Sequence, residues 1–122
     1  MMQLKHIFLS LSVSLLLVGC ANAPQPPLYS WGDYVKSSTK YGMDGHNKEV
    51  LEQHSAELKK IIDESDMNKQ KVAPGIYAEY GQILFETGKK EDAKQYFLLE
   101  KKTYPESEKF INQIMKKLYG EA

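Results

Sequence analysis

Two short helical stretches, joined by a glycine turn and enclosed by Pro74 and Pro105, constrain the fold of this chain more than any other feature. At 100° per residue, one face of the first stretch collects Ile76, Tyr77, Tyr80, Gly81, Ile83 and Leu84. The opposite face carries Ala78, Glu79, Gln82 and Glu86. A helix with a single apolar face buries that face against a neighbour. The segment therefore predicts a helical hairpin.

The turn and the second stretch support this prediction. Gly88 is placed to end the first helix, because glycine readily adopts the left-handed conformation found at helix C-termini. Glu91 and Asp92 put negative charge where the second helix begins, and Pro105 ends it. Gly81 would cost about 1 kcal/mol relative to alanine within a helix. Its place on the apolar face therefore predicts a close approach by the neighbouring helix.

Seven positions in this segment resemble the tetratricopeptide repeat, a 34-residue helix-turn-helix unit. They are Tyr77, Gly81, Leu84, Gly88, Ala93, Phe97 and Pro105. The segment departs from the repeat at Glu100, where the repeat usually has alanine. The resemblance implies antiparallel helical hairpins that stack and leave a concave face for binding other proteins.

Three further stretches have helical periodicity, and together they predict an all-α domain of about five antiparallel helices over residues 29–122. These stretches are residues 30–41, 48–65 and 106–118, with Ser30 and Asn47 placed as caps of the first two. Trp31, Tyr34 and Tyr41 either pack against the next helix or face a ligand. His54 lies within an apolar stripe, where it is either a core residue with one hydrogen bond or a functional base.

The first nineteen residues are typical of a signal peptide, since Lys5 precedes an apolar run that is too short to span a membrane. The run ends in Leu17-Val18-Gly19-Cys20, which has the pattern of a lipobox. Bacterial lipoproteins with this pattern carry diacylglycerol on the cysteine thiol and a further acyl chain such as palmitate. Cys20 is the only cysteine, so lipid on it leaves no thiol for a disulfide or for catalysis.

Residues 20–28 are expected to form a tether between this anchor and the domain. Its prolines favour an extended chain with a reach of about 25 Å. The residue after the cysteine is Ala21 rather than aspartate, a pattern that resembles lipoproteins sorted to the outer membrane. We therefore expect a protein anchored by lipid in the outer membrane and facing the periplasm.

The composition argues against several classes of chemistry. All sixteen basic residues are lysine and the formal net charge is zero, which does not favour nucleic-acid binding. No nucleotide-binding or hydrolase motif occurs, and the spacing of His46 and His54 matches no zinc signature. We therefore expect no catalysis, no cofactor and no metal.

Glu100 is the carboxylate that interrupts the packed face of the second helix, and a buried carboxylate requires a partner. One interpretation is a structural hydrogen bond to a tyrosine hydroxyl, to His54 or to a lysine. The other is a partner-binding groove in which Glu100 holds a backbone or amine group and Tyr77, Tyr80 and Tyr96 supply the walls.

A narrower resemblance covers nearly the whole mature chain. It rests on three segments, Leu28-Tyr29-Ser30-Trp31-Gly32-Asp33-Tyr34, Pro74-Gly75-Ile76-Tyr77-Ala78-Glu79 and Tyr104-Pro105-Glu106-Ser107. These are similar to small bacterial lipoproteins of the domain of unknown function 4810. The resemblance implies a scaffold that assists an envelope complex containing a lipoprotein similar to the curli secretion channel. A pilotin-like chaperone for an outer-membrane pore subunit is the alternative, and a cell-wall enzyme is the third interpretation.

Overall fold

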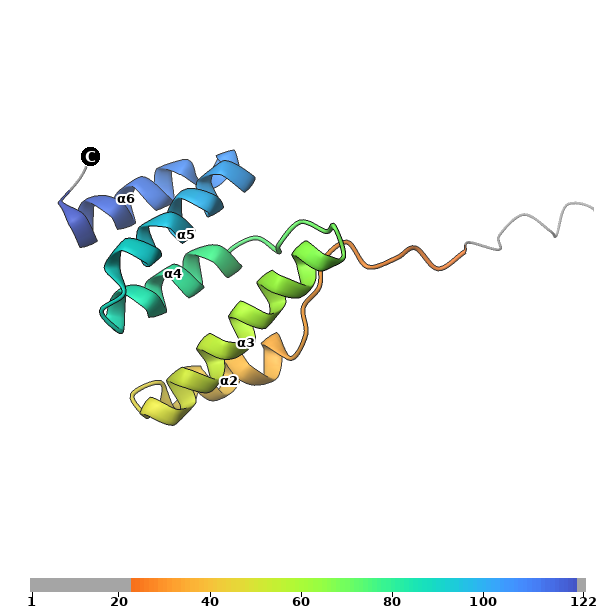
Figure 1. The fold of residues 1–122 in the computed structure, drawn as a ribbon, viewed down its shortest axis with the longest axis horizontal. Coiled ribbons are helices and arrows are strands. Elements are labelled where there is room, and N and C mark those ends of the chain that lie inside the picture. Colours follow the sequence, from red (N-terminus) through yellow and green to blue (C-terminus); the bar gives the residue numbers. More distant parts are fainter. Residues whose placement is uncertain (1–22, 121–122) are drawn as a thin grey trace, which may run out of the picture.

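The structure is a computed structural model that describes residues 23–120, and this part of the chain folds into five α-helices with no strand (Figure 1). The helices are α2 (Tyr34–Asp44), α3 (Lys48–Met67), α4 (Ile76–Glu86), α5 (Lys90–Thr103) and α6 (Glu108–Tyr119), with a 3-10 turn at Pro105–Ser107 before α6. The prediction of an all-α fold with five helices is confirmed.

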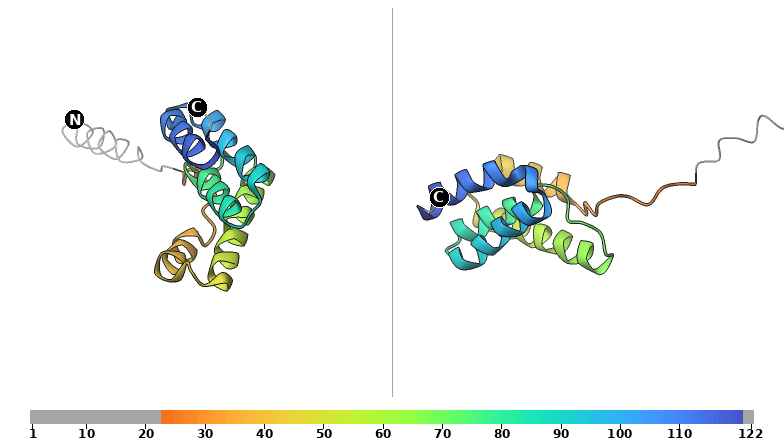
Figure 2. Two further views of the ribbon diagram at one scale, coloured as in Figure 1. Left: turned by 90° about the vertical axis from the view of Figure 1, so that its left-hand side faces the viewer. Right: turned by 90° about the horizontal axis from the view of Figure 1, so that it is seen from above.

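Each helix packs mainly against the next one along the chain, so that α2 and α6 lie at opposite ends of the array (Figure 2). Two apolar clusters form the core. The first joins α3 to the α3–α4 connector and α4 through Leu58, Ile61, Ile62, Val72, Ala73, Ile76 and Ile83. The second joins α4, α5 and α6 through Ala78, Leu84, Ala93, Phe97, Ile111 and Met115.

Because α4 contributes to both clusters, the prediction that it buries a single face is wrong. Ala78, which the sequence assigned to the solvent side, is buried in the second cluster. Glu79 beside it is also partly covered, with 27% of its side chain exposed. The helix lies in the middle of the array, so its polar face meets other helices instead of water.

The α4–α5 contact is closest at Gly81. A Cβ atom at this position would lie 3.1 Å from Phe97 Cε1 and 3.2 Å from the Ala93 carbonyl oxygen, so a side chain would force the two helices apart. This is the close approach that the sequence predicted. Gly88, with φ of +88°, follows the end of α4 and turns the chain into α5.

The start of α2 differs from the prediction. Ser30 does not cap the helix; its hydroxyl donates to Glu64 Oε2 at 3.4 Å, and α2 begins only at Tyr34. Gly32 has φ of +44°, a left-handed conformation that interrupts any helix starting at Ser30. The cap expected at the next helix is present, because Asn47 Oδ1 accepts from the backbone N–H of Glu49 at 3.0 Å.

The chain enters the domain through an exposed segment. Residues 23–28 are extended and exposed, and Gln70 Nε2 donates to the Pro27 carbonyl at 2.8 Å. Cys20 and the signal peptide lie outside the described residues. Among the helices that the structure describes, none is long and apolar enough to cross a membrane.

Candidate functional site

The three tyrosines predicted to line a groove lie together where α4 meets α5. The Tyr80 and Tyr96 rings meet edge to face with centroids 4.7 Å apart, and Tyr77 lies 6.2 Å from Tyr96. All three rings are half-buried and pack against the first apolar cluster. Their contacts with one another and with the core account for much of their surface.

Glu100 is buried beneath this region, with 3% of its surface exposed. Its Oε1 accepts from the backbone N–H of Gly75 at 2.8 Å, and Gly75 is the residue that immediately precedes α4. Burial raises the pKa of Glu100, although the backbone N–H groups of Gly75, Ala78 and Tyr77 oppose the shift.

The hydrogen-bond partner of Glu100 is therefore a backbone amide, not the tyrosine, histidine or lysine side chain that the sequence suggested. The carboxylate of α5 caps the N-terminus of α4 from a neighbouring helix, where Gly75 has no side chain to do so. In this structure Glu100 is too buried to hold a partner's backbone or amine.

A second polar cluster joins three helices around His54, which is 1% exposed. Ser37 of α2 lies with its Oγ 2.5 Å from His54 Nδ1, and Glu79 of α4 has its Oε1 2.8 Å from His54 Nε2. Tyr34 completes the chain by donating its hydroxyl to Glu79 Oε2 at 2.9 Å. The Tyr41 ring stacks on the imidazole with centroids 4.8 Å apart. We call Tyr34, Ser37, His54 and Glu79 the His54 network.

Burial and hydrogen bonds shift the pKa values of Glu79 and Tyr34 in this network. Burial raises the pKa of Glu79, but hydrogen bonds from His54 and Tyr34 outweigh burial and leave the pKa below its ordinary value of 4.5. Burial and the same carboxylate raise the pKa of Tyr34 to about 12. Because ionised Glu79 can only accept, His54 Nε2 donates to it, while Ser37 Oγ and His54 Nδ1 share a second hydrogen bond.

The order Ser37, His54, Glu79 is also that of a hydrolase triad, but the backbone N–H of Ser37 is not available as an oxyanion donor. Acyl transfer needs backbone or side-chain donors aimed at a developing oxyanion near the nucleophile. Ser37 lies within α2, and its own N–H donates to the Asp33 carbonyl at 3.0 Å as part of the helix. The network instead ties α2, α3 and α4 together.

Sequence reasoning anticipated a buried His54 but missed its partners. His54 is separated from Ser37 by 17 residues and from Glu79 by 25, and each lies on a different helix. Such separations leave no spacing pattern in the sequence. The partly buried Glu79 was placed on the solvent side by periodicity alone.

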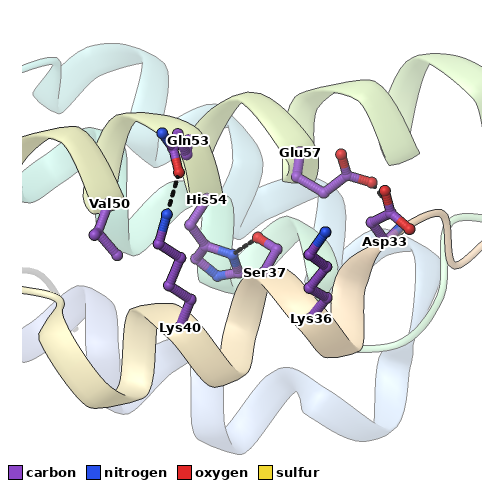
Figure 3. A pocket seen from close by; sticks show the side chains of 8 residues that line it. All are labelled: Asp33, Lys36, Ser37, Lys40, Val50, Gln53, His54 and Glu57. Atoms are coloured by element: carbon purple, nitrogen blue, oxygen red, sulfur yellow. Dashed lines mark hydrogen bonds between the residues drawn. The ribbon is translucent and has the colours of Figure 1, made fainter.

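An open pocket of about 270 Å³ lies between α2 and α3 on one side of the network (Figure 3). Its lining residues already pair with one another: Lys40 Nζ donates to Gln53 Oε1 at 2.7 Å. Glu57 Oε1 accepts from the Asp33 backbone N–H, also at 2.7 Å. Among the described residues, no group of three or more metal-ligating side chains comes together.

A larger hollow of about 370 Å³ lies on the other side of the network, bordered by α2, α4 and α6. We call it the α2–α4–α6 groove, and its lining consists of Tyr41, Gly75, Ala78, Glu79, Gln82, Ile83, Phe110 and Ile114. Phe110 is 57% exposed, an unusual position for a large apolar ring. Polar Glu79 and Gln82 lie across from it on α4. The groove thus combines an apolar wall with a few polar groups.

Comparison with known proteins adds the family. Residues 28–114 match the family described as Domain of unknown function (DUF4810). No curated protein and no solved structure matches the chain. The match spans more than half of the 122 residues. The chain therefore belongs to the DUF4810 family.

Proposed function

We propose that this protein is a lipid-anchored scaffold that faces the periplasm and binds another envelope protein through the α2–α4–α6 groove. One observation carries the proposal: Phe110 and Ile114 offer an apolar wall opposite Glu79 and Gln82 of α4. A groove with an apolar wall and a few fixed polar groups suits a peptide segment that bears one apolar side chain.

We place binding in this groove rather than at the tyrosine cluster because the two sites differ in what they leave available. Tyr77, Tyr80 and Tyr96 are already packed against one another. Glu100, the proposed polar contact of that surface, is buried under α4. Phe110, in contrast, gains a partner only when something enters the groove.

Sequence features support the other three parts of the proposal: the lipid anchor, the protein-binding role and the identity of the partner. The lipobox at Cys20 and the adjacent Ala21 favour lipid attachment at the outer membrane. Tetratricopeptide-like hairpins are protein-binding units. The resemblance to DUF4810 lipoproteins suggests, as the partner, a lipoprotein similar to the curli secretion channel, with this protein as an accessory of that complex.

Substitution in the groove tests the proposal. We expect Phe110→Asp to reduce recovery of the channel-like lipoprotein in a crosslinked pull-down by about tenfold or more, because buried aromatic anchors dominate interface energies. The control is Met67→Asp, since Met67 is 79% exposed at the end of α3 and outside the groove. Equal recovery with both variants, at equal melting temperature, would reject the groove as the binding surface.

The anchor has its own test. We expect Cys20→Ala to block lipidation, so that mass spectrometry detects an unprocessed precursor. A protein of mature length that still fractionates with the outer membrane would exclude the anchor.

A pilotin-like chaperone is the alternative function, and the lifetime of the complex separates the two. An accessory stays with the finished assembly, whereas a pilotin binds its pore subunit transiently. Pull-downs made after new synthesis has stopped should still recover the partner if the protein is an accessory.

A further inference from the structure

We propose that the outer face of α2, together with the segment that leads into it, lies on the lipid surface next to the anchor. The inference rests on the proposed lipid attachment and goes beyond it. The anchor alone would leave the domain free to turn on its tether, whereas a second contact with lipid holds it in one orientation.

The exposed apolar side chains of the molecule are concentrated here. Among residues 23–120, eight large hydrophobic side chains are exposed, and four of them belong to this segment. They are Leu28 at 73%, Trp31 at 44%, Val35 at 75% and Met43 at 83% exposure. None of the eleven residues of α2 is fully buried. Such a concentration of exposed apolar side chains is unfavourable on a surface that meets only water.

These side chains share one face. Val35, Thr39 and Met43 follow one another at intervals of four residues within α2, which places them on one side of the helix. Trp31, Val35 and Thr39 also line a single shallow surface pocket. We call these four residues and Leu28 the α2 stripe. The residues of α2 that meet α3 or the groove, Ser37 and Tyr41, lie on other sides of the helix.

The other end of the array shows that an exposed apolar stripe is not a general property of terminal helices. The outer surface of α6 is lined by Lys109, Asn112, Gln113 and Lys116. Both α2 and α6 end the helix array (Figure 2), but the α6 residues that line this surface are polar or charged. The difference favours an apolar phase beside α2.

The chemistry of the stripe fits a lipid surface. Tryptophan prefers the boundary between lipid headgroups and acyl chains, and exposed aliphatic side chains on one helix face insert at the same depth. Lys36 borders the stripe, where its ammonium group can contact anionic headgroups.

The tether between Cys20 and Leu28 is also short enough to keep the α2 stripe close to the lipid surface. Cys20 precedes Leu28 by eight residues, which span at most about 25 Å when extended. Gln70 holds the chain at Pro27, the residue before the start of the stripe. The segment that precedes the domain runs away from the helices (Figure 1). Docking of α2 leaves the α2–α4–α6 groove open, because Tyr41 faces the groove from a different side of α2.

The sole tryptophan of the chain is a reporter for this contact. The lipidated protein would be reconstituted into vesicles of phosphatidylethanolamine and phosphatidylglycerol, with acyl chains either unmodified or brominated near the headgroup. We expect brominated lipid to quench the Trp31 fluorescence and unmodified lipid to shift its emission to shorter wavelength.

Two variants provide the controls. Val35→Glu combined with Met43→Glu should abolish quenching while the protein still co-sediments with vesicles through its anchor and melts as the parent does. Met67→Glu, an equally exposed methionine outside the stripe, should leave quenching unchanged.

The outcomes separate this inference from the proposed anchor. Anchored protein whose Trp31 is equally bright in brominated and unmodified vesicles overturns the docking of α2, and crosslinks between copies or to a partner would then identify what covers the stripe. Protein that carries no lipid and does not co-sediment overturns the anchor and the docking together.

Discussion

The two helical hairpins of this protein have similar outlines but are held together by different chemistry. In the α4–α5 hairpin, Gly81 lets the Phe97 ring approach the backbone, and the contact is apolar. In the α2–α3 hairpin, hydrogen bonds between Ser37, His54 and Glu79 lie at the centre. The first contact depends on shape and the second on proton positions. The α2–α3 hairpin is therefore the one whose attachment responds to pH and to single polar substitutions.

The two hairpins also differ in whether their stabilising contacts lie within the hairpin or reach the neighbouring one. The closest α4–α5 contact, at Gly81, is made by residues of that hairpin alone. In the α2–α3 hairpin, His54 is hydrogen-bonded to Glu79 of α4, so the polar centre forms only when the two hairpins pack together. Since α2 has no fully buried residue, it should be the first helix to open.

The largest expected effect comes from filling the apolar contact. Gly81→Leu should lower the free energy of unfolding by about 3 kcal/mol or more, because the new side chain meets Phe97 and the Ala93 backbone. Gly42→Leu is the matched control in the other hairpin, where a Cβ atom meets nothing within 4 Å. Denaturant unfolding measures both. A Gly81 variant as stable as the Gly42 variant would contradict the shape-dependent contact.

The next effect comes from removing the shared acceptor of the polar centre. Glu79→Ala should cost about 2 to 3 kcal/mol, because it leaves the buried His54 and the Tyr34 hydroxyl without their acceptor. Hydrogen exchange should show lost protection in α2 before α5. Gln82→Ala, one turn further along α4, is the control. Uniform loss of protection in both hairpins would show that the network does not belong specifically to α2 and α3.

A smaller effect is expected at the start of α3 and not at the start of α5, the second helices of the two hairpins. Asn47→Ala should cost about 1 kcal/mol, because Asn47 accepts from the Glu49 and Val50 backbone N–H groups. Lys89 occupies the corresponding position before α5 and makes no side-chain cap. Lys89→Ala should therefore leave the melting temperature unchanged. A loss of the same size at both positions would remove this difference between the hairpins.

The smallest effects are the pH dependences of the two buried carboxylates, which have opposite signs. The pKa of Glu79 is lowered, so its contribution to stability is present above pH 4.5 and is lost as the pH falls below that value. The pKa of Glu100 is raised, so its ionised form is disfavoured and stability falls as the pH rises through that pKa.

Urea unfolding of the Gln variants between acidic and neutral pH measures both signs. Relative to the parent, Glu79→Gln should lose stability as the pH rises, and Glu100→Gln should gain stability over the same range. Parallel pH curves for the two variants would show that the two carboxylates do not lie in opposite environments.

Much of the fold was predictable from the sequence, because its signals are local. The 3.6-residue period defined five helices, Asn47 and Gly88 marked a beginning and an end, and Gly81 on an apolar face indicated a close helix contact. Each of these signals depends on residues within a few turns of one another. The first helix was placed four residues too early because the conformation of Gly32 is not visible in the periodicity.

The sequence by itself determined which segments are helical and which side chains are apolar, whereas the tertiary structure decided which helix each face meets. Periodicity assigned Ala78 and Glu79 to solvent, but α4 lies in the centre of the array and both are covered. The partner of Glu100 became the Gly75 backbone, and Ser37, His54 and Glu79 met from three helices. The physical reason is that a hydrogen bond between helices depends on their packing angle and register, and many distant residues set these together.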